Sequence, residues 1–423
     1  MKTTAVRLYG ENDLRLESFE LPQIKDDEIL AKVVSDSLCM SSYKATLQGS
    51  KHKRIPDDVN ENPIIIGHEF CGEIVAVGAK YKDKYKPGSK FVVQPSMNYK
   101  GSLAAPGYSF KYYGGDCTYI IIPGFVMEID CFLPYEGDSF FYGSLAEPMS
   151  CIVGGFHANY HHKKQGEYEH VMGIVEGGNV AILAGVGPMG LGAIDYAIHS
   201  DRKPKLLVVT DIDDARINRA KEILSPLEAE KNGVKLIYVN TANIENPTQY
   251  LIELTDGAGF DDVFVYAPVK SVIELGDSLL KKDGCLNFFA GPTDPNFTAN
   301  FNFYNVHYSS THIVGTTGGN TADMKESLKM MERKIIDPAA MITHIGGLNS
   351  VIEATKNLPN IKGGKKLIYT HIDVPLTAIS DFEELGKKDN LFKQLDLLVK
   401  KNNGLWSSEA EKYLLKNAKA LEI

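Results

Sequence analysis

The chain has 423 residues, which at roughly 150 residues per domain predicts two to three domains. Its 45 basic and 54 acidic side chains give a net charge of −9, so composition offers no electrostatic reason to bind nucleic acid or an anionic membrane. The six cysteines are scattered without a C-x-x-C pair, and no apolar run reaches the about 20 residues of a membrane span. A reduced, cytoplasmic protein without disulfides is expected.

The first part, residues 1–154, is predicted to be mostly β. Residues 5–10 and 14–20 form a predicted hairpin, and further alternating or β-branched runs follow after Gly and Pro turns. These further predicted strands lie at 28–38, 64–78, 86–95 and 117–123.

The second part, residues 155–295, alternates short apolar strands with helical patterns, which is typical of βαβ units around a parallel sheet. The predicted strands are 180–185, 205–213, 235–240, 262–268 and 285–291, and the clearest helices are 188–200 and 214–225. The predicted fold class is therefore α/β, with a doubly wound parallel sheet in this part.

A third segment, residues 296–376, contains an extended aromatic stretch at 301–319, a helix at 322–334 and a closing strand at 363–373. The remaining residues, 377–423, predict a helical C-terminal extension, in which Ser408 and Glu411 form an S-x-x-E capping box.

A glycine-rich loop follows the strand at 180–185 and opens a helix. Its residues Gly185, Val186, Gly187, Met189 and Gly190 form a G-x-G-x-x-G motif in the strand-to-helix context that a dinucleotide pyrophosphate needs. The N–H groups and dipole at the start of the helix would hold the phosphates.

A carboxylate follows at the spacing that this motif requires. Asp211, at the end of the next strand, lies 21 residues after Gly190 and would bond the adenosine ribose hydroxyls. It favours NAD(H) over NADP(H), although the nearby Arg216 could soften that preference.

The β-rich part also contains residue types that bind a catalytic zinc. Cys39, His68, Glu69 and Glu147 are the candidate ligands, since such a site uses three Cys, His or carboxylate ligands and leaves one open position. Ser41 could bond a substrate oxygen and relay its proton. Spacing alone does not establish this site.

Local motifs strengthen the assignment of a zinc site. They are Cys39-Met40-Ser41, the run Gly67–Gly72 with Val77-Gly78, Gly114-Gly115, Glu147-Pro148 and the form G-V-G-P-M-G of the nucleotide loop. In these motifs the chain resembles the polyol dehydrogenase branch of the zinc-dependent medium-chain dehydrogenase/reductase family, over about residues 1–375. The resemblance implies a GroES-like catalytic domain split around a Rossmann NAD-binding domain, and a homo-oligomer, dimeric or tetrameric.

Carried over to this sequence, the resemblance makes Cys39 and His68 zinc ligands and Ser41 the proton relay. Glu69 and Glu147 compete for the third ligand position. It also implies reduction of L-sorbose 1-phosphate to D-glucitol 6-phosphate with NAD(P)H, reversibly.

Three departures from the family pattern matter. Ser42 replaces an acidic residue, so the partner that orients His68 is expected elsewhere, and Lys44 replaces a histidine that passes the proton onward. The lobe at 96–113 has no cysteine, which predicts one zinc per chain, with packing of its aromatic residues in place of a structural zinc. These are Tyr99, Tyr108, Phe110, Tyr112 and Tyr113.

A phosphorylated substrate needs cationic groups, and the candidates are Lys44 and the run at 51–54. His161, His162 and His170 lie in a polar segment that predicts no more than adventitious surface metal binding.

Two other functions stay open on the sequence. One is dehydrogenation of a free polyol or of another secondary alcohol such as threonine. The other, from a different class, is a non-catalytic dinucleotide-binding protein, which retention of the metal-ligand residue types disfavours.

Overall fold

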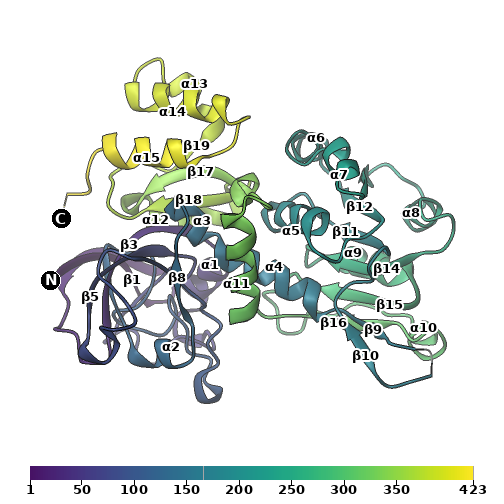
Figure 1. Cartoon of the computed structure of the whole chain (residues 1–423), viewed down its shortest axis with the longest axis horizontal. Helices are drawn as coiled ribbons and strands as arrows, with labels where there is room; N and C mark the ends of the chain where they lie inside the picture. Colours follow the sequence, from purple (N-terminus) through teal and green to yellow (C-terminus); the bar gives the residue numbers. More distant parts are fainter. Residues whose placement is uncertain (165, 423) are drawn as a thin grey trace. The chain divides into compact units, whose positions relative to one another are not determined.

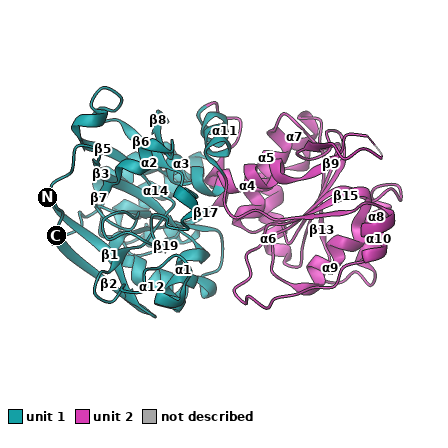
Figure 2. Cartoon of the chain, turned by 90° about the horizontal axis from the view of Figure 1, so that it is seen from below, with its two compact units in different colours: residues 1–148, 320–332, 342–423 teal, residues 149–319, 333–341 magenta. Residues whose placement is uncertain are grey.

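A computed structural model describes residues 1–164 and 166–422 of the chain. The chain divides into two compact units, shown in separate colours in Figure 2. Unit 1 comprises residues 1–148, 320–332 and 342–423, and unit 2 comprises 149–319 and 333–341. The first division falls within α4 (Ala146–Ala158). The sequence predicts domain boundaries at 154/155, 295/296 and 376/377. The division into compact units does not test these boundaries, which stay predictions.

Unit 1 is built on an eight-stranded sheet of order β19-β17-β18-β3-β5-β6-β8, in which β7 also pairs with β3. A smaller sheet has the order β2-β1-β4. The strands are β1 (Lys2–Gly10), β2 (Asp13–Glu20), β3 (Ile29–Leu38), β4 (Ile64–Ile65), β5 (Cys71–Val77), β6 (Lys90–Val93), β7 (Tyr119–Ile122), β8 (Phe132–Tyr135), β17 (Ile342–Gly347), β18 (Lys365–Tyr369) and β19 (Thr377–Ala378).

The larger sheet of unit 1 joins segments that are far apart in the chain. Strand β18 pairs antiparallel with β3, so that Lys366 lies opposite Leu38, and β3 pairs in turn with β5. The return of the chain after unit 2 thus completes the sheet that carries the metal motifs. The helices of this unit are α1 (Met40–Gln48), α2 (Gly124–Glu128), α3 (Phe140–Ser144), α11 (Thr321–Glu332), α12 (Val351–Asn357), α13 (Phe382–Leu385), α14 (Asn390–Lys401) and α15 (Ser408–Asn417).

Unit 2 contains a six-stranded parallel sheet of order β13-β12-β11-β14-β15-β16, as the alternating pattern predicts. Its apolar core lies between this sheet and the helices that connect the strands. The strands are β11 (Asn179–Leu183), β12 (Leu206–Asp211), β13 (Lys235–Asn240), β14 (Phe260–Val265), β15 (Leu280–Phe288) and β16 (His312–Val314). The helices are α5 (Pro188–His199), α6 (Asp214–Ile223), α7 (Pro226–Lys231), α8 (Pro247–Glu253), α9 (Lys270–Leu279) and α10 (Phe303–Tyr308).

A small antiparallel hairpin of β9 (Tyr160–His162) and β10 (His170–Met172) belongs to unit 2 as well. Figure 1 labels it beside β15, β16 and α10, and β9 contacts β15.

Two local predictions are wrong. The aromatic stretch at 301–319 is not extended throughout, because Asn302 caps the helix α10 by accepting from the N–H groups of Tyr304 and Asn305. The capping box at Ser408 and Glu411 does not form either. Ser407 is the N-cap of α15, and the Glu411 carboxylate accepts from the N–H groups of Phe140 and Phe141 at the start of α3.

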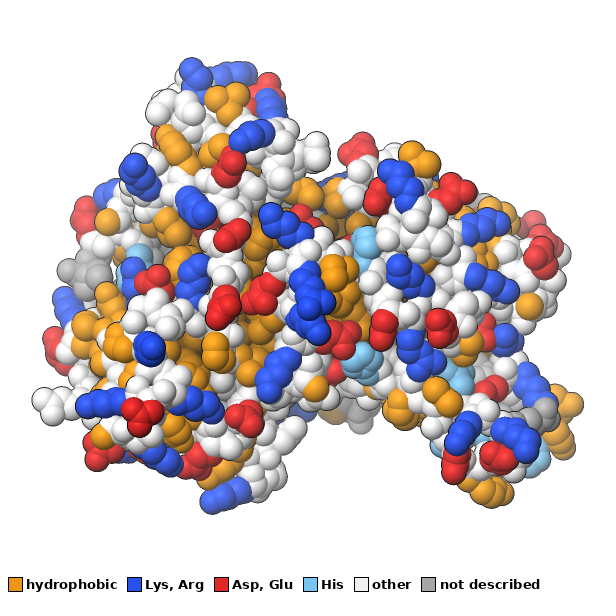
Figure 3. All heavy atoms as spheres, in the orientation of Figure 1, with side chains coloured by type: hydrophobic (Ala, Val, Ile, Leu, Met, Phe, Trp, Pro, Cys, Tyr) orange, Lys and Arg blue, Asp and Glu red, His pale blue; other side chains and the backbone are white. Residues whose placement is uncertain are grey.

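The C-terminal residues 377–422 belong to unit 1, and several of their side chains are buried in it. Trp406 is fully buried and donates from its indole nitrogen to the Tyr369 hydroxyl at 2.9 Å, and Tyr369 donates to Glu411. Among the described residues, no helix has the length and hydropathy needed to cross a membrane. All six cysteines are free, and basic and acidic side chains are intermixed on the face seen in Figure 3.

Candidate metal and dinucleotide sites

Cys39 lies where a strand meets a helix. It directly follows β3 and is the N-cap residue of α1, with an extended backbone at φ −117° and ψ 144°. The N–H groups of the first helical turn favour negative charge at this position, which suits a thiolate.

His68 and Glu69 lie in the loop between β4 and β5. Gly67 before them has φ +89°, and a Cβ at this position would lie 2.0 Å from the Asp36 carboxylate and 2.6 Å from the Asp116 nitrogen. Only glycine fits there, which explains the first residue of the G-H-E motif. The Glu69 N–H donates to Asp36 at 3.0 Å and fixes the loop against β3.

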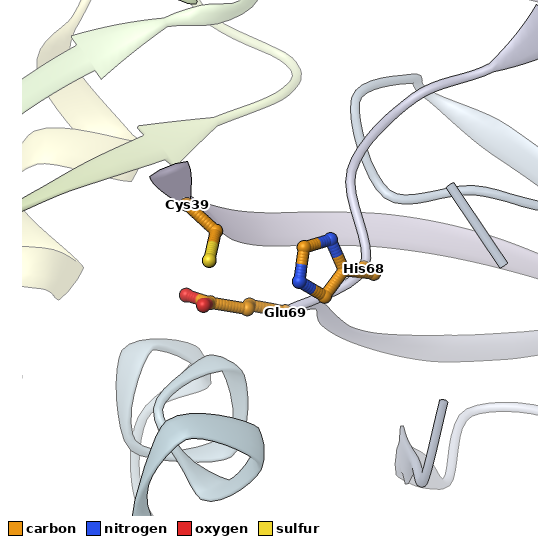
Figure 4. Close-up of side chains that lie close together, drawn as sticks. All are labelled: Cys39, His68 and Glu69. Atoms are coloured by element: carbon orange, nitrogen blue, oxygen red, sulfur yellow. The ribbon is translucent and has the colours of Figure 1, made fainter. Parts of the chain in front are cut away.

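The loop brings His68 and Glu69 to Cys39. One potential ligand atom from each of the three residues lies within 4.8 Å of the others, and Figure 4 shows the three side chains side by side. The Ser41 hydroxyl donates to the Cys39 sulfur at 2.9 Å and lies 3.3 Å from Nε2 of His68. A thiol, an imidazole and a carboxylate with a hydroxyl beside them form a donor set that fits a catalytic zinc.

Glu69 has a buried cationic partner that the sequence analysis did not identify. Lys365 of β18 donates to both carboxylate oxygens of Glu69 at 2.5 Å, and Ser37 also donates to this carboxylate. Burial alone would raise the pKa of Glu69, but the charge of Lys365 and the neighbouring donors hold it below its ordinary value. Glu69 is therefore ionised. Its carboxylate contacts the Lys365 ammonium and also lies close to Cys39 and His68.

Glu147, the other candidate third ligand, is buried on α4. Burial raises the pKa of the Cys39 thiol to about 12; the charges of Glu69 and Glu147 add to this, while Lys365 and Ser41 oppose it. A divalent cation would reverse this balance, because a coordinating thiol is deprotonated by its metal.

His68 is held on its other side by residues of α1 and of the lobe at 96–113. Its Nδ1 lies 3.4 Å from the Ser42 hydroxyl, so the expectation that its partner lies elsewhere is wrong. Ser42 lies in the first turn of α1, which brings its hydroxyl close to the His68 ring. The buried Tyr108 ring lies 5.1 Å from the His68 ring.

Tyr108 also connects the cluster to the basic run at 51–54. Its ring stacks on His52 at 5.5 Å, and the Arg54 guanidinium lies over it at 5.3 Å from the ring centre. The Nε atom of Arg54 is buried without a hydrogen-bond partner among the described residues. Lys51 pairs with Glu11 at 3.1 Å instead. Lys44, on α1, is half-buried, and burial lowers its pKa.

The other aromatic residues of the cysteine-free lobe at 96–113 pack on one another and on unit 1. Phe110 contacts Tyr113 and Phe125, Tyr99 stacks on Phe125, and Tyr112 contacts Phe19. Whether this packing stands in for a structural zinc stays a prediction.

In unit 2 the glycine motif forms the turn from β11 to α5. A Cβ on Gly190 would lie 2.0 Å from the Gly185 carbonyl oxygen, and one on Gly185 would lie 2.6 Å from Ile182. Both glycines therefore allow close packing, while the left-handed backbone of the turn falls on Ala184 at φ +53°. The N-cap Gly187 has no side chain, which leaves the first N–H groups of α5 open to a phosphate. Val186 is buried, and Met189 lies half-buried in the first turn.

Asp211 ends β12, beside this loop in the parallel sheet, and its Oδ1 accepts from the N–H groups of Ile212 at 2.8 Å and Asp213 at 3.2 Å. The Arg216 guanidinium lies 3.9 Å from Asp211, and its Nη2 is the atom that a Cβ on Gly187 would meet, at 3.1 Å. The three residues thus lie together at the carboxyl ends of the strands, where dinucleotides bind in such sheets.

Comparisons with known proteins agree with this geometry. Residues 25–130 match the model of the alcohol dehydrogenase GroES-like domain, and residues 188–333 match that of the zinc-binding dehydrogenase family. The predicted combination of a GroES-like domain and a Rossmann-type parallel sheet is confirmed.

The similarity extends over nearly the whole chain. Mannitol-1-phosphate 5-dehydrogenase of Aliivibrio fischeri (strain ATCC 700601 / ES114) is 53% identical over 98% of this chain and 97% of its own length. L-sorbose 1-phosphate reductase of Klebsiella pneumoniae is 49% identical over 98% of both chains. The crystal structure of 2R,3R-butanediol dehydrogenase from Bacillus subtilis shares the fold, with a TM-score of 0.70 at 21% identity over 87% of this chain and 99% of that chain. The chain is thus an enzyme and belongs to the zinc-binding medium-chain dehydrogenase/reductase family.

Proposed function

We propose that this enzyme is a zinc-dependent, NAD(P)(H)-linked polyol-phosphate dehydrogenase that reduces L-sorbose 1-phosphate to D-glucitol 6-phosphate. The observation that carries the proposal is the convergence of Cys39, His68 and Glu69 with the Ser41 hydroxyl beside them. A zinc ion held by Cys39, His68 and either Glu69 or Glu147 would polarise the ketone carbonyl, and the nicotinamide would supply the hydride.

We propose that Ser41 donates the proton that completes the reduction. Its hydroxyl lies 2.9 Å from the Cys39 sulfur and 3.3 Å from Nε2 of His68. It is therefore next to two of the proposed zinc ligands, where the substrate oxygen would bind. A positioned hydroxyl can donate to that oxygen and recover a proton from a neighbour. Lys44, four residues after the start of α1, is the candidate for passing the proton onward.

A phosphorylated substrate is supported by Arg54. The guanidinium is held over Tyr108, which in turn packs on His68, and its Nε is buried without a partner among the described residues. A planar guanidinium with an unused donor suits the two oxygens of a phosphate. Lys44 remains the second candidate for this role.

NAD(H) is the expected cofactor, because the Asp211 carboxylate repels a 2′-phosphate. Arg216 is close enough to Asp211, at 3.9 Å, to weaken this repulsion, so use of NADP(H) at lower efficiency fits the same arrangement.

The identity of the sugar is the finer part of the proposal, since the two relatives described above are named for different substrates, mannitol 1-phosphate and L-sorbose 1-phosphate. Initial rates with L-sorbose 1-phosphate, D-fructose 6-phosphate and the two free ketoses, each with NADH and with NADPH, test it. The proposal expects the highest kcat/KM with L-sorbose 1-phosphate and NADH. Equal rates with free ketoses would favour the alternative of a free-polyol or other secondary-alcohol dehydrogenase.

We also propose that the enzyme is a homo-oligomer, dimeric or tetrameric, and that it works in the cytoplasm. The support is the family membership and six free cysteines, which suit a reducing compartment.

A further inference from the structure

Unit 2 carries a second group of metal-binding residue types, on the hairpin β9–β10 and the two last strands of the parallel sheet. His162 ends β9, Asp283 lies within β15, and His312 begins the edge strand β16. One potential ligand atom from each of these residues lies within 4.8 Å of the others.

One oxygen of Asp283 is the meeting point of the group. Its Oδ1 lies 2.6 Å from Nδ1 of His162 and 2.7 Å from Nε2 of His312, while its Oδ2 accepts the backbone N–H of His162 at 3.0 Å. Both ring nitrogens thus lie at hydrogen-bonding distance from the same carboxylate oxygen, and the three potential ligand atoms form one close group. Zinc bonds of about 2.0–2.2 Å place tetrahedral ligand atoms about 3.3 Å apart, so a small expansion would admit the ion.

The carboxylate is held in place by contacts that lie outside the three side chains. Asp283 has a left-handed backbone at φ +61°, and its N–H donates to the Ser309 carbonyl at 2.7 Å. His161 contacts the Asp283 carbonyl at 2.8 Å through Nδ1 and Asp262 at 3.0 Å through Nε2. Such outer partners orient ligands in metal sites.

The hairpin carries one more histidine close to this group. His170 lies directly opposite His162 in the antiparallel register, so the two side chains are on the same face of the hairpin. The two rings are 5.1 Å apart, and the His170 ring is 6.2 Å from that of His312. His170 is exposed, and histidine side chains reach the surface in this part of unit 2 (pale blue at the lower right of Figure 3).

We propose that His162, Asp283 and His312, with His170 as fourth ligand, bind a Zn²⁺ ion that fastens the β9–β10 hairpin to strands β15 and β16. Imidazole and carboxylate ligands suit zinc, and four protein ligands would close the site to substrate, as in structural zinc sites. The expectation of one zinc per chain then gives way to two, with the second in unit 2 and not in the lobe at 96–113.

The test measures Zn²⁺ binding by calorimetry in a Cys39→Ser background, which disables the first cluster. Metal-free Cys39→Ser protein is compared with Cys39→Ser/Asp283→Asn, and with Cys39→Ser/His199→Gln as the matched control. His199 pairs with Asp195 at 2.8 Å in the same unit but belongs to neither metal cluster of the described residues. Asparagine tolerates the left-handed backbone of residue 283, so this variant is expected to fold.

The expected result is one Zn²⁺ per chain in Cys39→Ser and in the control, with affinity lowered at least about 100-fold by Asp283→Asn. A Cys39→Ser/His312→Gln protein should show the same loss, with unchanged circular dichroism, so that misfolding of one variant does not decide the matter. Hydrogen exchange of strands β9 and β10 should slow when Zn²⁺ is added to Cys39→Ser protein. Absence of binding in Cys39→Ser protein, or equal binding in all variants, would overturn the proposal.

Discussion

The two units each hold a cluster in which histidine and carboxylate side chains face one another, but the surroundings of the clusters differ. In unit 1 the Glu69 side chain is 1% exposed and is neutralised by the buried Lys365. In unit 2 the Asp283 side chain is 28% exposed and has two histidines as partners. A buried carboxylate requires a permanent cation from the protein, whereas a partly exposed one is stabilised by water and by hydrogen-bond donors.

The two clusters are therefore expected to have different roles. The cluster of unit 1 contains a thiol and has the Ser41 hydroxyl 2.9 Å from its sulfur, so it combines metal ligands with a proton donor. The cluster of unit 2 has histidines on a surface hairpin and neighbouring strands, where a metal would join segments of the chain. Substitutions in unit 1 test whether its cluster is catalytic.

The largest effect is expected at Cys39. Replacing its sulfur by an oxygen in Cys39→Ser should lower kcat/KM by about 10⁴-fold, because zinc contributes several kcal/mol to stabilising the developing charge. Steady-state kinetics and zinc content by elemental analysis measure it. Cys117→Ser is the control, since this buried thiol donates only to the carbonyls of Gly114 and Tyr119. The zinc content of the Cys39→Ser protein should fall from two ions per chain to one, because this variant keeps the site proposed for unit 2. A Cys39→Ser protein with undiminished activity would remove the catalytic role from the cluster of unit 1.

The second largest effect is expected at the buried ion pair between Lys365 and Glu69. Lys365→Met should lower the free energy of unfolding of the metal-free protein by about 3–5 kcal/mol, because it leaves the buried Glu69 charge uncompensated. Denaturant unfolding with and without zinc measures it. Added zinc should restore more stability in Lys365→Met than in the unsubstituted protein, and Lys365→Arg should retain most of the stability. Loss of the same size with zinc present would mean that Glu69 is not coupled to a metal.

A smaller effect is expected at the hydroxyl beside the cluster. Ser41→Ala should lower kcat about 100-fold with little change in KM, since a positioned proton donor contributes at least this much. Ser41→Thr retains the hydroxyl and should keep most of the activity. The pH profile of kcat should change in Ser41→Ala but not in Ser41→Thr, and an unchanged profile in both variants would exclude the relay.

The smallest effect concerns substrate binding. Arg54→Met should raise KM for the phosphorylated ketose about tenfold, equivalent to one charge-assisted hydrogen bond of about 1.5 kcal/mol, and leave KM for the free ketose unchanged. Lys44→Ala should show the same selectivity if it shares this role. The control is Lys53→Ala, an exposed residue of the same run. Equal effects on both ketoses would assign Arg54 a structural role.

The sequence predicts the parts of the sites that lie within short segments. Gly67-His68-Glu69 and the loop at 185–190 are local motifs because one turn must place glycines against backbone, as at Gly67 and Gly190. Lys365 could not be found this way. It follows Glu69 by 296 residues and reaches it only because β18 pairs with β3.

Other residues are misread from sequence because their partners are distant. Glu411 has the spacing of a helix cap for its own helix, yet it accepts from the N–H groups of Phe140 and Phe141, about 270 residues earlier. His162, Asp283 and His312 come from three separate strands, so no spacing motif relates them. Pairing of distant strands decides these contacts, and local patterns carry no information about it.

The most direct test of the catalytic assignment is reduction of L-sorbose 1-phosphate with NADH by one preparation, before chelation, after it, and after zinc is returned. Metal content is measured at each stage. The account predicts that turnover disappears with zinc and returns with it in the unsubstituted protein, and that Cys39→Ser stays inactive when zinc is restored. Full turnover by protein shown to be free of zinc would contradict it.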